Sequence, residues 1–401
     1  MNLDIAPILN LFRDRIRAAA SARTPLRLRG GGSKDFYGQS LQGEVLDTSV
    51  LRGIVSYEPS ELVVTVRSGT PLAELEALLA TSGQYLPFEP PHYGWSQGQA
   101  TVGGMVASGL NGPARASAGS VRDHVLGVTL LNGSGELLRF GGEVIKNVAG
   151  YDVSRVMVGA MGTLGLLVDV SLKVLPLPLA EATLTFNMTQ TEALAQLHSW
   201  GGQPLPLNAS CWVKEVEEGE GEGSRRNDGR NNQQGTLFLR LRGAVAAVEA
   251  ACKQLLNEAL PGAQAVRLNN APAAIGWRAC RDHQHAFFVT PPASNMALWR
   301  LSVAQTAPAL DLPWPQLVEW HGALRWLWAP MSASSVLRDV AATARGHATV
   351  FVANDTHLES GAGRFDVFTP LQPPLDRIHR QLKAEFDPAG VFNRGRLSDS
   401  F

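Results

Sequence analysis

Three consecutive glycines constrain this chain more strongly than any other feature of its sequence. They follow residues 26–29, in which leucine and arginine alternate as in a half-exposed strand, and they precede Ser33 and Lys34. Consecutive glycines can adopt positive φ without a Cβ clash, so their N–H groups can turn to one side and form an anion-binding nest. The hydroxyl and the amine would add donors to this nest. The stretch therefore predicts a phosphate site, with a plain glycine turn between two strands as the alternative.

Two further glycine-rich stretches lie in the same half of the chain. Within residues 94–119, the segment 101–109 predicts a short helix of small residues, on whose backbone an extended ligand could lie directly. The third stretch has a G-x-x-G-x-x-G spacing over residues 159–165, which differs from the Rossmann fingerprint. The first stretch also fails that fingerprint, because Asp35 stands where its third glycine belongs. A bound nucleotide would therefore be held by another fold.

The rest of the first half predicts strands with a few helices. An amphipathic helix is expected within residues 1–20, and a second helix is expected to begin at the N-cap Thr70, with Pro71 at its first position, and to end at Gly83. A turn at residues 132–135 indicates a hairpin. The expected strands are 44–46, 53–57, 62–67, 125–131, 136–140 and 166–174.

Beyond Pro176 and Pro178 the glycines thin out and strands alternate with helices. This order predicts an antiparallel sheet with helices on one face. Residues 215–234 have a single apolar side chain, Val216, and predict a mobile hairpin tip. The expected strands are 182–188, 209–214 and 236–242, and the expected helices are 191–200, 244–260 and 375–386.

Length, charge and cysteine content limit the class of protein. A chain of 401 residues is too long for one ordinary domain. Its net charge of −1 gives no electrostatic reason to expect nucleic acid or an anionic membrane as a partner. Cys211, Cys252 and Cys280 are too few for a four-cysteine iron–sulfur cluster, and they fit a reducing cytoplasm. No stretch is long and apolar enough to span a membrane, so we expect a cytoplasmic protein.

Five motifs, taken in order, resemble one protein family. They are the glycine run with Ser33 and Lys34, the pair Gly103-Gly104, Arg-Asp-His-Val-Leu-Gly at 122–127, Gly-Thr-Leu-Gly at 162–165, and Phe-Asp-Pro with Asn-x-Gly-Arg at 386–396. Together they resemble the vanillyl-alcohol-oxidase type of FAD-binding proteins, and within it the FAD-binding subunits of bacterial glycolate oxidases.

The resemblance implies an α+β fold and FAD as cofactor. Residues 1–180 would form a two-lobed PCMH-type FAD-binding domain. Residues 181–385 would form a cap domain of antiparallel sheet and helices with a mobile insertion at 215–235, and residues 386–401 would return to the FAD domain as a tail.

The resemblance also assigns candidate cofactor-binding residues. Relatives with covalent flavin often have a histidine directly after such a glycine turn, so Ser33 at this place predicts dissociable FAD. The implied contacts are Gly30, Gly31, Gly32, Ser33 and Lys34 for the pyrophosphate, Gly103, Gly104, Ser117 and Gly119 for the isoalloxazine and ribityl side, Gly162, Thr163 and Gly165 for the adenine half, and Asn393 and Arg396 from the tail.

The catalytic residues are the weakest part of the resemblance. Related hydroxy-acid dehydrogenases carry a run like His-x-x-Asp-Gly-Asn-x-His, in which a general base removes the hydroxyl proton, and this chain has no such run. His321 and Arg325 are the candidates that remain, and packing against neighbouring tryptophans is the alternative role for both. His283 and His285 predict a helix surface, and no metal site is expected.

The resemblance implies the FAD-binding subunit of a multi-subunit glycolate oxidase. Its partners would be a catalytic FAD subunit, which oxidises glycolate to glyoxylate, and an iron–sulfur subunit. Any contact with the inner face of the membrane would come through this complex. Two alternatives stay open: an autonomous FAD-dependent 2-hydroxy-acid dehydrogenase, and a flavin-less structural subunit of the same complex.

Overall fold

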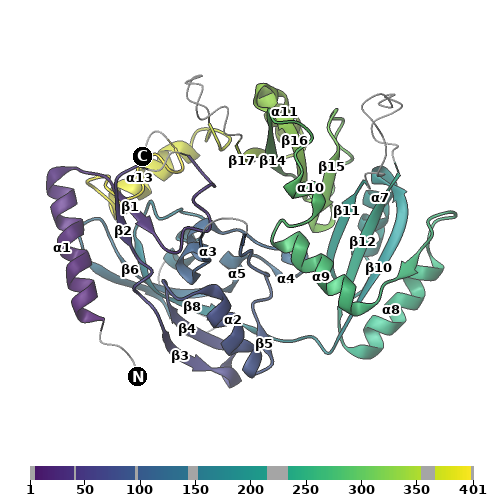
Figure 1. Cartoon of the computed structure of the whole chain (residues 1–401), viewed down its shortest axis with the longest axis horizontal. Coiled ribbons are helices and arrows are strands. Elements are labelled where there is room, and N and C mark those ends of the chain that lie inside the picture. Colours follow the sequence, from purple (N-terminus) through teal and green to yellow (C-terminus); the bar gives the residue numbers. More distant parts are fainter. Residues whose placement is uncertain are drawn as a thin grey trace. The chain divides into compact units, whose positions relative to one another are not determined.

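A computed structural model of the chain describes residues 5–39, 42–94, 98–142, 152–214, 234–353 and 366–398 (Figure 1). The chain forms two compact units. Unit 1 contains Met1–Gly112, Gly119–Leu177 and Phe365–Phe401, and unit 2 contains Pro113–Ala118 and Pro178–Arg364. Nearly all of the mobile insertion expected at 215–235 lies outside the described residues.

These units differ from the expected domains at two places. The short helix α4 (Arg115–Ala118) belongs to unit 2, where it packs on β11 (Leu207–Val213). The helix α13 (Leu375–Phe386) belongs to unit 1, because Leu382 and Phe386 pack against the core of that unit.

Unit 1 is built on an antiparallel five-stranded sheet in the order β3-β4-β8-β6-β7. Its strands are β3 (Ile54–Glu58), β4 (Val63–Arg67), β6 (Val125–Leu131), β7 (Leu137–Gly141) and β8 (Leu166–Lys173). The apolar side chains of β4 and β8 pack in one core with those of α2 (Leu72–Thr81) and α3 (Val102–Ser108). The expected strands and the hairpin between β6 and β7 are confirmed.

A second core of unit 1 brings the two ends of the chain together. The amphipathic helix α1 (Ala6–Ala22) buries Phe12 and Ile16 against a parallel pair of strands, β1 (Leu26–Arg29) and β2 (Glu44–Asp47). The tail adds to this core, because Leu26 N–H donates to Val391 O at 2.8 Å and Phe392 is fully buried. The short elements of unit 1 are β5 (Gln84–Tyr85), α5 (Val121–His124), α6 (Val153–Val156), β9 (Leu175–Pro176) and the 3₁₀ turn Pro59–Glu61.

Threonines stand before two helices of unit 1, and only one of them caps its helix. Thr101 caps α3 as its position before the small residues suggests, and its Oγ1 accepts from Gly104 N–H at 3.3 Å. Thr70 does not cap α2, contrary to our prediction. Its Oγ1 accepts from Gly53 N–H at 3.0 Å instead, so a tertiary contact takes the hydroxyl and the helix begins at Leu72.

Unit 2 is an eight-stranded sheet in the order β13-β10-β12-β11-β15-β16-β14-β17, all antiparallel. Helices α7 (Gln190–Gly201) and α8 (Val245–Asn257) cover one face (Figure 1). Besides β11, the strands are β10 (Ala180–Thr189), β12 (Gln234–Gly243), β13 (Val266–Arg267), β14 (Met296–Ser302), β15 (Gln316–Glu319), β16 (Leu324–Pro330) and β17 (His347–Val352).

One expectation for unit 2 was wrong, because helices lie on both faces of its sheet. Helix α9 (Asn270–Arg281) packs on the face opposite α7 and α8, where Trp277 Nε1 donates to Thr183 Oγ1 at 3.0 Å. Thr183 alternates along β10 with Ala182 and Leu184, which belong to the core under α7 and α8. The remaining elements of unit 2 are α10 (Ala286–Val289), α11 (Ser334–Thr343) and the 3₁₀ turns Trp320–Gly322 and Met331–Ala333.

None of the helices in the described part of the chain is long and apolar enough to cross a membrane.

Candidate functional site

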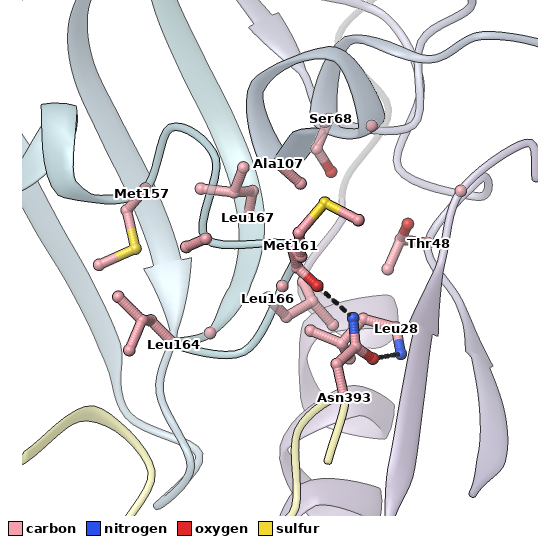
Figure 2. A pocket seen from close by; sticks show the side chains of 16 residues that line it. Leu28, Thr48, Ser68, Ala107, Met157, Met161, Leu164, Leu166, Leu167 and Asn393 are labelled. Carbon is pink, nitrogen blue, oxygen red and sulfur yellow. Dashed lines mark hydrogen bonds between the residues drawn. The ribbon is translucent and has the colours of Figure 1, made fainter. Parts of the chain in front are cut away.

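Two adjoining cavities in unit 1 gather most of the candidate cofactor-binding residues. They share the wall residues Leu28, Gly30, Gly104, Ala107, Met161 and Asn393. The first cavity is further lined by Thr48, Ser68, Gly103, Met157, Ala160, Gly162, Leu164, Gly165, Leu166 and Leu167 (Figure 2). The second is further lined by Arg27, Arg29, Gly31, Gly32, Ser33, Lys34, Asp35, Thr101, Ser108 and Arg396.

The glycine run combines a tight backbone contact with a wall of the second cavity. Gln99 N–H donates to Gly31 O at 3.0 Å, and a Cβ on Gly31 would lie only 1.8 Å from Gln99 O. Gly32 has a φ of +76°, which other residues rarely adopt. Glycine is therefore required here for the turn itself, and the same turn brings backbone to the cavity wall. The geometry of the run fits both of our interpretations, a glycine turn and a backbone that binds a ligand.

Cationic side chains surround the run. Arg27 and Arg29 both reach the carboxylate of Asp35, and Arg29 Nε donates to it at 2.8 Å. Arg27 Nε is buried, and no described residue accepts a hydrogen bond from it. Lys34 Nζ lies 3.3 Å from Ser33 Oγ and 5.5 Å from the centre of the Tyr93 ring. This wall of the second cavity offers positive charge and donors, as an anionic group requires.

Arg396 holds the loop after the glycine run in place. Its guanidinium donates to the backbone oxygens of Lys34 and Asp35, both at 3.1 Å, and of Gln39 at 2.8 Å. Burial lowers the pKa of Arg396 to about 10, which leaves the group charged at neutral pH. The tail thus shapes the cavity wall through this side chain.

Gly103 and Gly104 lie in the first turn of α3 but have different surroundings. A Cβ on Gly103 would lie 2.8 Å from Ser68 Cβ, so this glycine allows the helix to pack on the end of β4. A Cβ on Gly104 would meet only Thr101 Oγ1, at 3.2 Å, and Gly104 lines both cavities. Gly104 therefore keeps open the space where the two cavities meet.

The first cavity is mostly apolar, with two hydroxyls on one side. Ser68 and Thr48 face the apolar side chains around Met161 (Figure 2). Thr48 Oγ1 donates to Arg29 O at 3.2 Å, whereas Ser68 Oγ is buried without a hydrogen-bond partner among the described residues. A buried hydroxyl with no partner is unfavourable unless a ligand or water satisfies it.

Asn393 joins two backbone segments that line the cavities. Its Oδ1 accepts from Leu28 N–H at 2.7 Å, and its Nδ2 donates to Met161 O at 2.6 Å (Figure 2). A Cβ on Gly162, whose φ is +72°, would lie 2.6 Å from Asn393 Nδ2. The side-chain amide is therefore used for joining the strand before the glycine run to the turn at Gly162.

Thr163 lies behind the cavity wall. Its Oγ1 donates to Ala160 O at 2.7 Å, and its backbone oxygen accepts from Lys383 Nζ, also at 2.7 Å. Lys383 also donates to Asp387 Oδ2 at 2.6 Å and to Phe392 O at 2.9 Å. Asp387 in turn accepts from the N–H groups of Val391 and Phe392. This buried network fixes the tail against the turn that carries Gly162.

Ser117, Gly119, His321 and Arg325 line neither cavity. Gly119 belongs to unit 1, and the other three belong to unit 2. Ser117 Oγ lies 3.1 Å from His321 Nε2, and His321 N–H donates to Ser210 Oγ at 2.9 Å. Burial lowers the pKa of His321 to about 4, so the imidazole is neutral at pH 7.

The histidine pair also differs from our prediction. His283 follows α9 with a φ of +54° and is buried, with its ring stacked 4.0 Å from that of Phe288, so it does not lie on a helix surface. Burial lowers the pKa of His283 to about 3. Among the described residues, no group of three or more His, Cys, Asp or Glu side chains could hold a metal.

The arrangement fits an extended dinucleotide such as FAD. Arg27 Nε and Ser68 Oγ are buried polar atoms that a ligand could satisfy, one in each cavity, and Gly104 leaves backbone open between them. Sequence reasoning missed Arg27, Asp35 and Ser68. The alternation of Arg27 and Arg29 places both on one face of a strand, which was a usable signal, whereas nothing in the sequence marks Ser68.

Comparisons with known proteins agree with this geometry. Residues 12–141 match the family model for an FAD binding domain. The fold is similar to that of 4-ethylphenol oxidase from Gulosibacter chungangensis, with a TM-score of 0.67 at 13% identity over 97% of this chain and 87% of that one. The predicted fold class, a PCMH-type FAD-binding domain with a cap of antiparallel sheet and helices, is confirmed.

Two curated relatives are named as subunits of glycolate oxidase. The chain is 30% identical to subunit GlcD of Bacillus subtilis (strain 168) over 43% of this chain and 37% of that protein. It is 43% identical to subunit GlcE of Escherichia coli (strain K12) over 96% of this chain and 95% of that protein. With this identity over nearly its whole length, the chain, which carries an FAD binding domain, belongs to the family of the glycolate oxidase subunit GlcE.

Proposed function

We propose that this chain is the FAD-binding subunit of a multi-subunit glycolate oxidase and holds FAD in the two cavities of unit 1. The observation that carries the proposal is the junction at Gly104, where a cationic glycine turn meets a mostly apolar cavity. The similarity to GlcE over nearly the whole chain supports the assignment to such a complex.

Different residues would contact different parts of FAD, according to their chemistry. The glycine run, with Ser33, Lys34 and Arg27, offers amide, hydroxyl and cationic donors to the pyrophosphate. Gly104 lets the cofactor pass close to the backbone of α3, and Ser68 supplies a hydroxyl in the first cavity. Bound FAD would supply the redox chemistry, while the chain binds, orients and shields it.

We further propose that the FAD is dissociable. Among the described residues that line the two cavities there is no histidine, cysteine or tyrosine that could form a covalent bond to flavin. Acid or heat denaturation of the yellow protein is therefore expected to release all of its flavin into the supernatant, measured by its absorption. Yellow colour that stays with the precipitated chain would contradict this.

The proposed partners follow from what the chain itself carries. Its three cysteines are fewer than a four-thiolate iron–sulfur cluster needs, so such a cluster would be carried by another subunit. A larger flavoprotein subunit would oxidise glycolate to glyoxylate, because neither cavity of this chain offers a histidine base. The chain would relay electrons or support the assembly beside it.

Purification alone and with the neighbouring subunits tests this function. The isolated chain is expected to contain flavin but not to reduce a dye with glycolate, whereas the reconstituted complex does both. The measurements are flavin content and glycolate-dependent dye reduction. Dye reduction by the isolated chain would support an autonomous dehydrogenase, and a folded chain without flavin would support a structural subunit; either result contradicts the proposal.

A further inference from the structure

One carboxylate lies among the positive charges of the second cavity. Of the described residues that line this cavity, Asp35 has the one acidic side chain, whereas four have cationic side chains, namely Arg27, Arg29, Lys34 and Arg396. A site for a pyrophosphate gains affinity from positive charge and loses affinity where a like charge faces the ligand. Asp35 therefore opposes the electrostatic attraction that the other four side chains offer.

The Asp35 carboxylate bridges two of these cations. Its Oδ2 accepts from Arg27 Nη2 at 2.5 Å and from Arg29 Nε at 2.8 Å. Both hydrogen bonds are charge-assisted, and guanidinium groups bind phosphate oxygens with the same donors. The carboxylate oxygen thus lies between the two guanidinium groups, where a phosphate oxygen could be held by both.

This ion cluster lies against the glycine run. A Cβ on Gly32 would overlap Arg29 Nη2, so the Arg29 guanidinium packs directly on the backbone of this glycine. Asp35 N–H donates to Gly32 O at 3.1 Å and closes the turn that follows the run. The carboxylate and the proposed pyrophosphate site consequently belong to one short turn of the chain.

The backbone at Asp35 is held in place, but its side chain can turn away. Arg396 donates to the backbone oxygens of Lys34 and Asp35, both at 3.1 Å, so a shift of the loop would break these contacts. The Asp35 side chain is 34% exposed, so water can solvate the carboxylate once it rotates away from the arginines. Ion pairs with this exposure contribute little to stability, and a ligand phosphate could replace the carboxylate at small cost.

We propose that Asp35 is an internal competitor of the FAD pyrophosphate for Arg27 and Arg29, and that it sets how readily the chain releases its cofactor. The inference rests on the proposed function, because it concerns the site that would hold FAD. A ligand phosphate has to separate the carboxylate from the two arginines, or share them with it against charge repulsion. In both cases the carboxylate weakens the binding of FAD.

The FAD affinity of D35N tests this inference. The full-length chain is deflavinated and titrated with FAD, and flavin fluorescence gives the dissociation constant. D35N keeps the size of the side chain but removes its charge, so it should bind FAD on the order of tenfold more tightly than the wild type. Unchanged binding would overturn the inference. Weaker binding would also overturn it, because Asp35 would then orient the arginines toward the ligand.

The stability of the flavin-free chain should change in the opposite direction. D35N loses the ion pairs with Arg27 and Arg29, so its unfolding midpoint should be slightly lower than that of the wild type. The tighter FAD binding should also diminish at about 1 M salt, because salt screens charges that are accessible to solvent. An affinity gain that is the same at low and high salt would contradict a competition between charges.

D169N is the matched control for D35N. Asp169 pairs with Arg67 at 2.7 Å in the sheet of unit 1, and neither residue lines the cavities. D169N also removes the charge of a paired aspartate, but it should leave the FAD dissociation constant unchanged. An equal gain in affinity in D169N and D35N would overturn the inference. If D35N does not fold, D35S replaces it with the same expected results.

R29M shows whether the competition involves the arginines. It removes one of the two cations that Asp35 and the ligand would share, so it should weaken FAD binding, and D35N should then increase the affinity less than it does in the wild type. An equal increase in both backgrounds would overturn the inference.

Failure of the inference and failure of the proposed function give different results. If the wild type binds FAD and D35N does not bind it more tightly, the FAD site stands and the competition does not. If the folded wild type binds no FAD, the proposed function fails and the inference fails with it.

Discussion

Replacing Gly104 with leucine is expected to weaken FAD binding about 100-fold or more while the chain keeps its fold. The new side chain would enter the space where the two cavities meet, and its Cβ has only Thr101 Oγ1 within 4 Å. Replacing a glycine within a helix stabilises the helix by roughly 0.5–1 kcal/mol, and this gain offsets the cost of the close contact between the new Cβ and Thr101 Oγ1. FAD titration of the deflavinated chain gives the affinity, and thermal unfolding gives the stability.

Substitutions at two other glycines of the site are less informative than G104L. G103A places a Cβ 2.8 Å from Ser68 Cβ, and G31A places one 1.8 Å from Gln99 O, so both should destabilise the fold itself. Loss of flavin in those variants would not distinguish a binding defect from unfolding. Undiminished FAD affinity in G104L would show that the cofactor does not pass this junction.

Replacing Asp387 with alanine is expected to lower the free energy of unfolding by about 3–5 kcal/mol. The substitution leaves the buried Lys383 ammonium without its counter-charge and removes the acceptor of the Val391 and Phe392 N–H groups. Because Lys383 also holds Thr163 O, the turn at the first cavity should loosen, and FAD affinity should fall as well. Chemical denaturation of the flavin-free chain measures the free energy of unfolding.

The stability of the chain should also depend on pH through Lys383. Burial, partly opposed by Asp387, lowers the pKa of Lys383 below its usual value. The folded state then binds fewer protons than the unfolded state, so this group makes the protein more stable as the pH rises toward the ordinary lysine range. Without Asp387 the pKa of Lys383 falls further. The difference in free energy of unfolding between wild type and D387A should therefore shrink between pH 7 and pH 9.

K383M is the matched control for D387A. It removes the charge but leaves Asp387 with its two backbone N–H donors, so it should destabilise the chain less than D387A does. Equal stability of D387A and wild type would mean that the buried ion pair does not hold the tail.

Local signals predicted the parts of the site that depend on backbone. The glycine run, in which Gly32 has positive φ, and the short helix of small residues that begins after Thr101 are both marked by short stretches of sequence. Alternating or helical periodicity likewise predicted most strands and helices of both units. These features need no knowledge of distant residues, which is why they could be predicted.

The features that the sequence does not specify depend on contacts between distant segments. Thr70 has the sequence of an N-cap, but its hydroxyl is taken by Gly53, 17 residues away. Ser117 belongs to unit 2, where it contacts His321. Asn393 lines both cavities, and both ends of its amide hold backbone groups of unit 1. No local pattern specifies such partners, so only the folded chain reveals them.

The flavin-to-protein ratio of the isolated, folded chain tests the central claim most directly. If the two cavities hold FAD, the wild-type chain saturated with FAD and passed through gel filtration retains close to one flavin per chain, and G104L with the same unfolding midpoint retains almost none. A folded wild-type chain that retains no flavin, or a G104L chain that retains as much as the wild type, would contradict the claim.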